Sequence, residues 1–175
     1  KLEKKKFLNQ LFKKEMPIIV FIGRLTKNKK IDILIKSVGI INKHNPKVNL
    51  LIIGEGPQKK NLEFLSINTL NKSNFLFYGE LYDEKKKAEL LYKSTICISP
   101  GNIGLTAIHS LSYGTPIASH KNLNFQMPEV ESIIDGENGF LFKQNDIIDL
   151  SNKILFWIEN NKPNKRDIRK IIDDK

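Results

Sequence analysis

The sequence has a single cysteine, Cys97, which excludes an internal disulfide bond. Because Cys97 stands in the apolar run 94–99, we expect it to be a small buried hydrophobic residue. No apolar run approaches the roughly 18–20 residues that a membrane-spanning helix needs, and the lysines at the start are not followed by a signal-peptide core. The sequence therefore predicts a cytoplasmic chain without a membrane span or secretion signal.

Arginine is scarce, whereas lysine, asparagine and isoleucine are abundant, and the formal net charge is +10. Such a charge attracts nucleic acid, anionic membranes and phosphorylated ligands alike, and an AT-rich genome would produce the same bias with no functional cause. The lysines are spread along the chain, and no basic segment is interleaved with aromatic residues. We therefore expect no nucleic-acid partner. The charge alone does not choose between an anionic membrane, a phosphorylated ligand and a compositional bias.

The length of 175 residues suits one domain, and a first residue other than methionine indicates a piece of a longer chain. From Pro17 onward, apolar runs typical of buried strands alternate with segments of helical periodicity. Strands are expected over 18–22, 48–53, 75–78, 95–99, 116–119 and 139–142, and helices over 31–41, 58–66, 84–92, 105–113 and 147–159.

This alternation predicts an α/β fold with a Rossmann-like open parallel sheet and helices on both faces. Residues 1–16 are interpreted as an N-terminal connector or helix, residues 17–160 as one Rossmann-like domain, and residues 161–175 as a C-terminal tail. Ligands of such sheets bind where the strands end, so the loops that follow the strands are the candidate site.

Two of these loops favour an anionic ligand. Arg24 follows the first strand directly, with Lys29 close behind; a forked guanidinium and a mobile ammonium suit phosphate, although a solvated basic turn is the alternative. The segment 101–106 joins a strand to a helix, and its backbone N–H groups face the ligand edge, although such a turn also occurs for packing alone. Together the two loops predict one phosphate-bearing ligand.

Six collinear segments make this indication specific. They read IVFIGRLTKNKK, LLIIGEGPQKKNL, FLFYGEL, ICISP, GLTAIHSLSYGTPIAS and PEVESIIDGENGFLF. Their order and spacing over residues 17–159 resemble the C-terminal donor-binding domain of the family-four retaining glycosyltransferases, which have the GT-B fold and are also named glycosyl transferases group 1. The resemblance implies one half of a GT-B fold.

The resemblance also implies roles for particular residues. Arg24 and Lys29 match the family residues that contact the donor diphosphate and stabilise its departure, and they are the predicted catalytic pair. The resemblance implies that no metal is needed, and the lack of an Asp-x-Asp motif and of a cluster of His and Cys ligands is consistent with this. The predicted donor-binding residues are Gly23, Gly79, Leu81, Gly101, Asn102, Ile103, Gly104, Leu105, Thr106, His109 and Glu129.

The sequence departs from the family pattern at two glutamates that are separated by seven residues. The first aligns with Gly101 and the second with His109. The first glutamate normally contacts the donor sugar, whereas His109 can still bind the ribose through a ring nitrogen or can simply be a histidine on a helix face. Lys30 stands where the family has a glycine.

A polar loop follows the fifth strand and provides further candidates near the donor sugar, with an ordinary surface loop as the alternative. These residues are His120, Asn122, Asn124, Gln126 and Glu129. Glu55 is a further candidate for the cleft, with a turn role as its alternative.

The resemblance predicts a retaining hexosyltransferase that moves a sugar from a nucleoside diphosphate donor, with a UDP-sugar expected, to a glycan or lipid-linked acceptor, as in bacterial surface polysaccharide assembly. The expected partners are the nucleotide sugar, an N-terminal acceptor domain without which the fragment is inactive, and an anionic membrane surface at the cytoplasmic side. The alternatives are a non-catalytic nucleotide-sugar-binding module of the same fold, a sugar-nucleotide epimerase and a nucleic-acid-binding domain.

Overall fold

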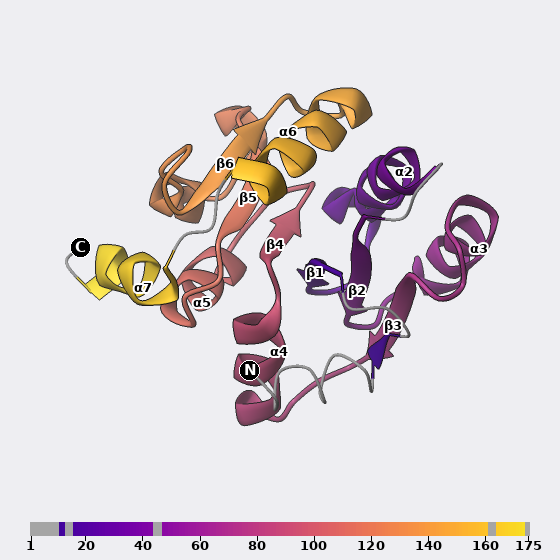
Figure 1. Ribbon diagram of the computed structural model, residues 1–175, viewed down its shortest axis with the longest axis horizontal. Helices are drawn as coiled ribbons and strands as arrows, with labels where there is room; N and C mark the ends of the chain where they lie inside the picture. Colours follow the sequence, from indigo (N-terminus) through magenta and orange to yellow (C-terminus); the bar gives the residue numbers. More distant parts are fainter. Residues whose placement is uncertain (1–10, 13–15, 44–46, 161–163, 174–175) are drawn as a thin grey trace.

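The computed structural model describes residues 11–12, 16–43, 47–160 and 164–173. Its centre is a six-stranded sheet in which every neighbouring pair is parallel, with the order β3-β2-β1-β4-β5-β6 (Figure 1). The strands are β1 (Ile18–Ile22), β2 (Asn49–Ile53), β3 (Phe75–Gly79), β4 (Ile96–Ser99), β5 (Ile117–His120) and β6 (Gly139–Phe142). The α/β parallel sheet predicted from the sequence is confirmed.

Helices cover both faces of this sheet (Figure 1). They are α2 (Ile31–Asn42), α3 (Lys59–Thr69), α4 (Glu84–Lys93), α5 (Thr106–Ser112), α6 (Ile147–Asn160) and α7 (Lys165–Asp173). Short 3₁₀ helices are η1 (Lys27–Lys29), η2 (Leu123–Phe125) and η3 (Pro128–Ser132). In the described part of the chain, no helix combines the length and the apolar character needed to cross a bilayer.

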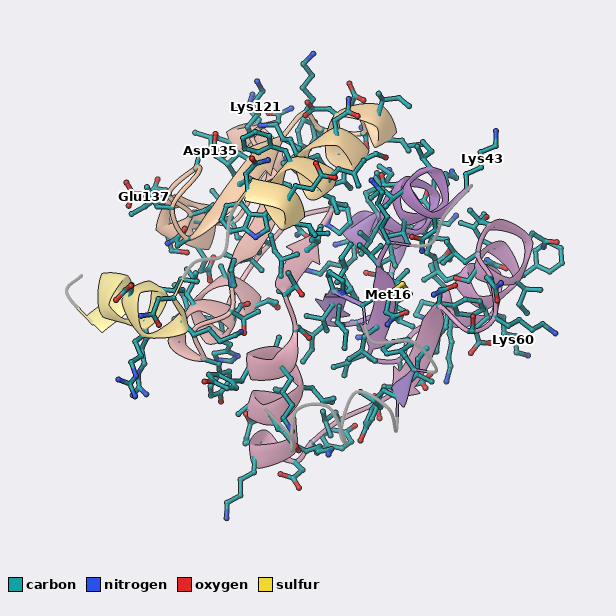
Figure 2. All side chains as sticks on the ribbon, in the orientation of Figure 1. Met16, Lys43, Lys60, Lys121, Asp135 and Glu137 are labelled. Atoms are coloured by element: carbon teal, nitrogen blue, oxygen red, sulfur yellow. The ribbon has the colours of Figure 1, made fainter. Side chains whose placement is uncertain are left out.

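The two faces of the sheet carry separate hydrophobic cores because successive strand residues point to opposite sides. In β1, Ile19 and Phe21 pack with α2, α3 and α6, whereas Ile18 and Val20 pack with α4, α5 and α7. Burial on both faces explains why the strands read as continuous apolar runs. Charged side chains such as Lys43 and Lys60 extend outward from the ribbon (Figure 2).

The strand order reverses between β1 and β4, which are hydrogen-bonded neighbours although two strands separate them in the sequence. This reversal is the switch point at which open α/β sheets bind ligands. Backbone hydrogen bonds join the loops along this edge. Gly54 N donates to Gly79 O at 2.8 Å, and Gly101 N donates to Lys29 O at 3.0 Å. The loops after β1, β2, β3 and β4 therefore form one connected surface.

The C-terminal segment differs from its prediction as a tail. It contains α7, whose Ile168 is 1% exposed and packs into the core beside α5. Most residues of this short helix are charged, so the segment has little periodic apolar signal. At the other end, most of the predicted connector lies outside the described residues, but Phe12 is buried against the same core.

Cys97 lies on β4, fully buried, as the sequence predicts. Burial raises the pKa of its thiol to about 12. The thiolate is the form that reacts with alkylating reagents, so native Cys97 should resist iodoacetamide at pH 8 and react only after unfolding in urea. Mass spectrometry of both samples measures this difference, and equally fast labelling of the native chain would contradict the burial of Cys97.

Candidate functional site

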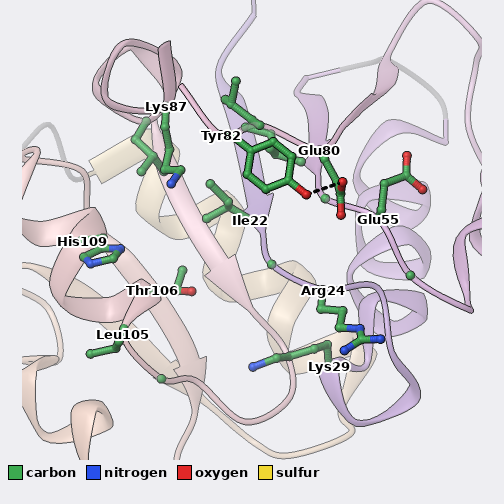
Figure 3. Close-up of a pocket in the computed structure, with 17 residues that line it drawn as sticks. Ile22, Arg24, Lys29, Glu55, Glu80, Tyr82, Lys87, Leu105, Thr106 and His109 are labelled. Carbon is green, nitrogen blue, oxygen red and sulfur yellow. Dashed lines mark hydrogen bonds between the residues drawn. The ribbon is translucent and has the colours of Figure 1, made fainter. Parts of the chain in front are cut away.

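A pocket of about 820 Å³ lies at the carboxyl ends of β1, β2 and β3 and extends to the start of α5 (Figure 3). It brings together most of the residues that the sequence predicts for donor binding. These are Gly23, Arg24, Lys29, Leu81, Gly104, Leu105, Thr106 and His109. Four loops that are distant in sequence therefore meet at one site.

Lys29 lies at the junction of the loops after β1 and β4. It is half-buried, and its Nζ donates a hydrogen bond to the carbonyl oxygen of Asn102 at 2.8 Å. Burial lowers the pKa of Lys29, because the charged ammonium loses hydration. Figure 3 shows its side chain reaching from the β1 loop toward the start of α5. An ammonium held in this way can meet an anion at that helix terminus.

Lys30 has the left-handed backbone that glycine favours, with φ of 53°. This residue ends η1 and begins α2, and its backbone N–H donates to Lys27 O. The family glycine expected at this position is therefore replaced by a lysine in the conformation that a glycine would adopt. The lysine adds a positive charge to this loop.

The opposite side of the pocket carries carboxylates. Glu80 accepts a hydrogen bond from the Tyr82 hydroxyl at 2.6 Å, which raises the pKa of that tyrosine. Glu55 forms an ion pair with Lys59. Because Glu55 and Glu80 lie on the β2 and β3 side while Lys29 points to the α5 side, the pocket has an acidic end and a basic end (Figure 3).

Lys87 is a pocket residue that the sequence reasoning missed. It projects from α4 into the pocket and its side chain is 18% exposed, with an ion pair to Glu84 on the same helix (Figure 3). The signal was the helical spacing, since Lys87 stands three and four residues before the buried Leu90 and Leu91 and so shares their inward face.

Five predicted donor-binding residues do not line this pocket. Gly101 and Asn102 line a second cavity on the other side of the β4–α5 loop, together with His120 and Gln126. The Ile103 side chain is fully buried in the core. The other two predicted residues, Gly79 and Glu129, line neither the larger pocket nor the second cavity.

The position of Gly101 has no space for a side chain. A Cβ atom there would lie 2.7 Å from the Cα of Lys29 and would overlap the carbonyl oxygen of Asn28. The family glutamate that aligns with Gly101 therefore cannot be accommodated on this backbone. The β4–α5 loop, residues 100–105, instead packs directly onto the β1 loop.

The chain matches a model of a known protein family. Residues 3–172 match the family model described as glycosyl transferases group 1. The chain belongs to this family. A glycosyltransferase of Haemophilus influenzae, itself uncharacterized, is 28% identical over 161 residues, covering 87% of this chain and 42% of that protein. The chain thus spans less than half the length of that glycosyltransferase.

Solved structures of glycosyltransferases share the fold. The C-terminal domain of a glycosyl transferase group 1 family protein, LpcC of Francisella tularensis, is 19% identical with a TM-score of 0.78, covering 98% of this chain and 91% of that one. HepE of Anabaena, solved in complex with UDP, is also 19% identical with a TM-score of 0.78, covering 98% of this chain and 47% of that one. The chain therefore has the fold of a C-terminal GT-B domain, as the sequence resemblance implied.

The packing of Gly101 gives a test with a matched control. Gly101→Ala should lower the free energy of unfolding by about 1–3 kcal/mol, because its methyl group forces two backbones apart. Gly104→Ala, three residues later, has nothing within 4 Å of the added Cβ and should change stability by no more than about 0.5 kcal/mol. Urea unfolding compares the two, and equal effects would show that Gly101 is not packed as described.

Proposed function

We propose that the larger pocket binds the diphosphate of a nucleoside diphosphate sugar, with UDP as the nucleotide, for transfer of the sugar to a glycan or lipid-linked acceptor. The observation that carries the proposal is the convergence of Arg24, Lys29 and the start of α5 in one pocket at the switch point of the sheet. The UDP complex of the structurally similar HepE supports the choice of nucleotide.

The proposed orientation of the donor follows the charge distribution of the pocket. The diphosphate lies at the basic end, where Lys29 donates to its oxygens and the N–H groups of Leu105 and Thr106 face it. The Arg24 guanidinium, which points away from the Lys29 ammonium in Figure 3, turns to donate to the diphosphate as well. The nucleobase lies toward Glu80 and Leu81 after β3. The ribose lies between them, within reach of the His109 ring on α5.

Glycosyl transfer breaks the bond between the anomeric carbon of the sugar and an oxygen of the β-phosphate. Negative charge accumulates on the departing diphosphate, so fixed cations beside it lower the barrier. We assign this role to Lys29 and Arg24. A hexose donor and retention of anomeric configuration are the finer parts of the proposal, and an acceptor domain from the rest of a longer protein would complete the cleft.

The packing at Gly101 favours a second candidate, a nucleotide-sugar-binding module that does not catalyse transfer. A family glutamate that contacts the donor sugar has no counterpart at this position. Both candidates require nucleotide binding. Turnover of a UDP-sugar by the longer protein separates them, because only the transferase releases UDP.

Calorimetric titration with UDP, GDP and ADP tests the binding step. Saturable binding of UDP is expected, weakened about tenfold or more by Arg24→Ala, which removes a charge-assisted hydrogen bond, and about fivefold by His109→Ala. Lys60→Ala is the control, since Lys60 projects from α3 away from the pocket (Figure 2). Failure of a folded sample to bind any of the three nucleotides would count against the proposal.

Lys87 offers a separate test with a control on the same helix. Lys87→Met keeps the apolar stem and removes the ammonium from the pocket, so UDP affinity should fall about tenfold and depend less on salt. Lys85→Met changes an exposed lysine outside the pocket and should leave the affinity unaltered. Equal affinities for the two variants would remove Lys87 from the site.

A further inference from the structure

The second cavity, of about 320 Å³, lies on the opposite side of the two loops that frame the larger pocket. Residues that are close in sequence within these loops line different cavities. Lys29 lines the larger pocket while Asn28 and Lys30 line the second, and Gly104 lines the larger while Asn102 lines the second. The hydrogen bond from Gly101 N to Lys29 O holds this partition in place.

The lining of the second cavity is rich in carboxamides and contains no carboxylate. Its amide side chains are Asn28, Asn102, Gln126, Gln144 and Asn145. Each carboxamide both donates and accepts hydrogen bonds, which matches the double capacity of a hydroxyl group. Phe125 adds an aromatic side chain that is 63% exposed, a surface on which the C–H face of a sugar ring can pack.

Some of these amide groups already form hydrogen bonds within the protein. Gln126 Oε1 accepts from Ile103 N at 2.8 Å, and its Nε2 donates to Ser119 Oγ and His120 O at 2.8 and 2.9 Å. Gln144 Oε1 accepts from Asn122 Nδ2 at 2.7 Å, which fixes the orientation of its amide. These hydrogen bonds hold the side chains of Gln126 and Gln144 in place in the free protein.

Other amide atoms of the lining have no hydrogen-bond partner within the described residues. The Oδ1 atom of Asn102 is buried and has no hydrogen-bond partner in the described structure. A buried polar atom without a partner is unfavourable, and a hydroxyl donor from a ligand that reached this atom would satisfy it. Within the described residues, Gln144 Nε2 and the Asn145 side chain likewise make no hydrogen bond to protein.

Two features show that the backbone around the cavity is specialised. Lys30 and Asn145, with φ of 53° and 60°, are the two non-glycine residues of the described chain with positive φ, and both line this cavity. Such conformations persist where the surrounding structure holds them and are concentrated at ligand sites. His120, also in the lining, accepts a hydrogen bond from Asn122 N on Nδ1 at 3.3 Å, which leaves the proton on Nε2 as a donor.

We propose that this cavity is a saccharide subsite that binds one neutral, hydroxyl-rich pyranose ring, separately from the nucleotide pocket. Its volume is at the lower end of the roughly 300–1,000 Å³ typical of small-molecule sites, which suits one ring rather than a long glycan. Its one ammonium, that of Lys30, belongs to an exposed side chain, so a phosphate ligand is less well matched than in the larger pocket. The proposal does not depend on nucleotide binding.

The test is a titration of the ¹⁵N-labelled 175-residue chain with the methyl α-glycosides of glucose, galactose, mannose and N-acetylglucosamine, followed by amide chemical shifts. At least one glycoside should give saturable shifts at the side-chain amides of Asn102 and Gln144. These shifts should persist in Arg24→Ala and in the presence of UDP, which separates this site from the proposed donor site.

Variants with intact backbones locate the site. Asn145→Gly suits the left-handed backbone and removes the amide, and it should weaken glycoside binding about fivefold. Asn124→Ala, on the nearby loop but outside the lining, should leave binding unchanged. The proposal is overturned if none of the four glycosides shifts these amides, if UDP displaces the glycoside, or if inorganic phosphate alone produces the shifts.

Discussion

The arrangement of both cavities depends on the direct contact between the backbones of two loops. Gly101 follows β4 and lies against Asn28 and Lys29, with its N–H bonded to Lys29 O at 3.0 Å. Any side chain at this position would force the β1 and β4 loops apart. The contact turns Lys29 toward one side and its neighbours toward the other. A single glycine therefore separates a cationic pocket from an amide-lined cavity.

The loop after β5 supports the same contact from the other side. Ser119 Oγ donates to Ser99 O at 2.8 Å, and Gln126 accepts the N–H of Ile103 that the short β4–α5 loop leaves without a helical partner. Buried backbone donors need such partners, because leaving one unsatisfied costs as much as a lost hydrogen bond. The polar loop after β5, which the sequence suggested for the donor sugar, thus stabilises the β4 loop through Ser119 and Gln126. Its residues His120 and Gln126 line the second cavity.

The sequence was sufficient for the fold and for much of the larger pocket. Most of the strands are buried apolar runs, and the loop after each strand must reach the same edge of a parallel sheet, so the loop of Arg24 and Lys29 could be placed beside the start of α5 in advance. The position of His109 in the site followed from the family resemblance. Gly101 could not be placed, since the alignment gives its counterpart in the family but not how closely the β1 and β4 loops pack. Lys87 was missed for another reason: site residues were expected in the loops after the strands, and Lys87 lies on a helix, where its spacing to Leu90 and Leu91 indicates the inward face.

The environment of Lys29 shows how a site without a nearby carboxylate can be prepared for an anion. Its ammonium is bonded to the neutral carbonyl of Asn102, and burial lowers its pKa, so the charged form is incompletely stabilised in the free pocket. The bond from the ammonium to this carbonyl has one charged partner, whereas a phosphate oxygen would add a charged acceptor and a Coulomb attraction, so a phosphate oxygen can compete with that carbonyl. Because the backbone around Gly101 leaves no space for a side chain, no residue at this position can pair with the ammonium, which stays available to the diphosphate in the proposed role.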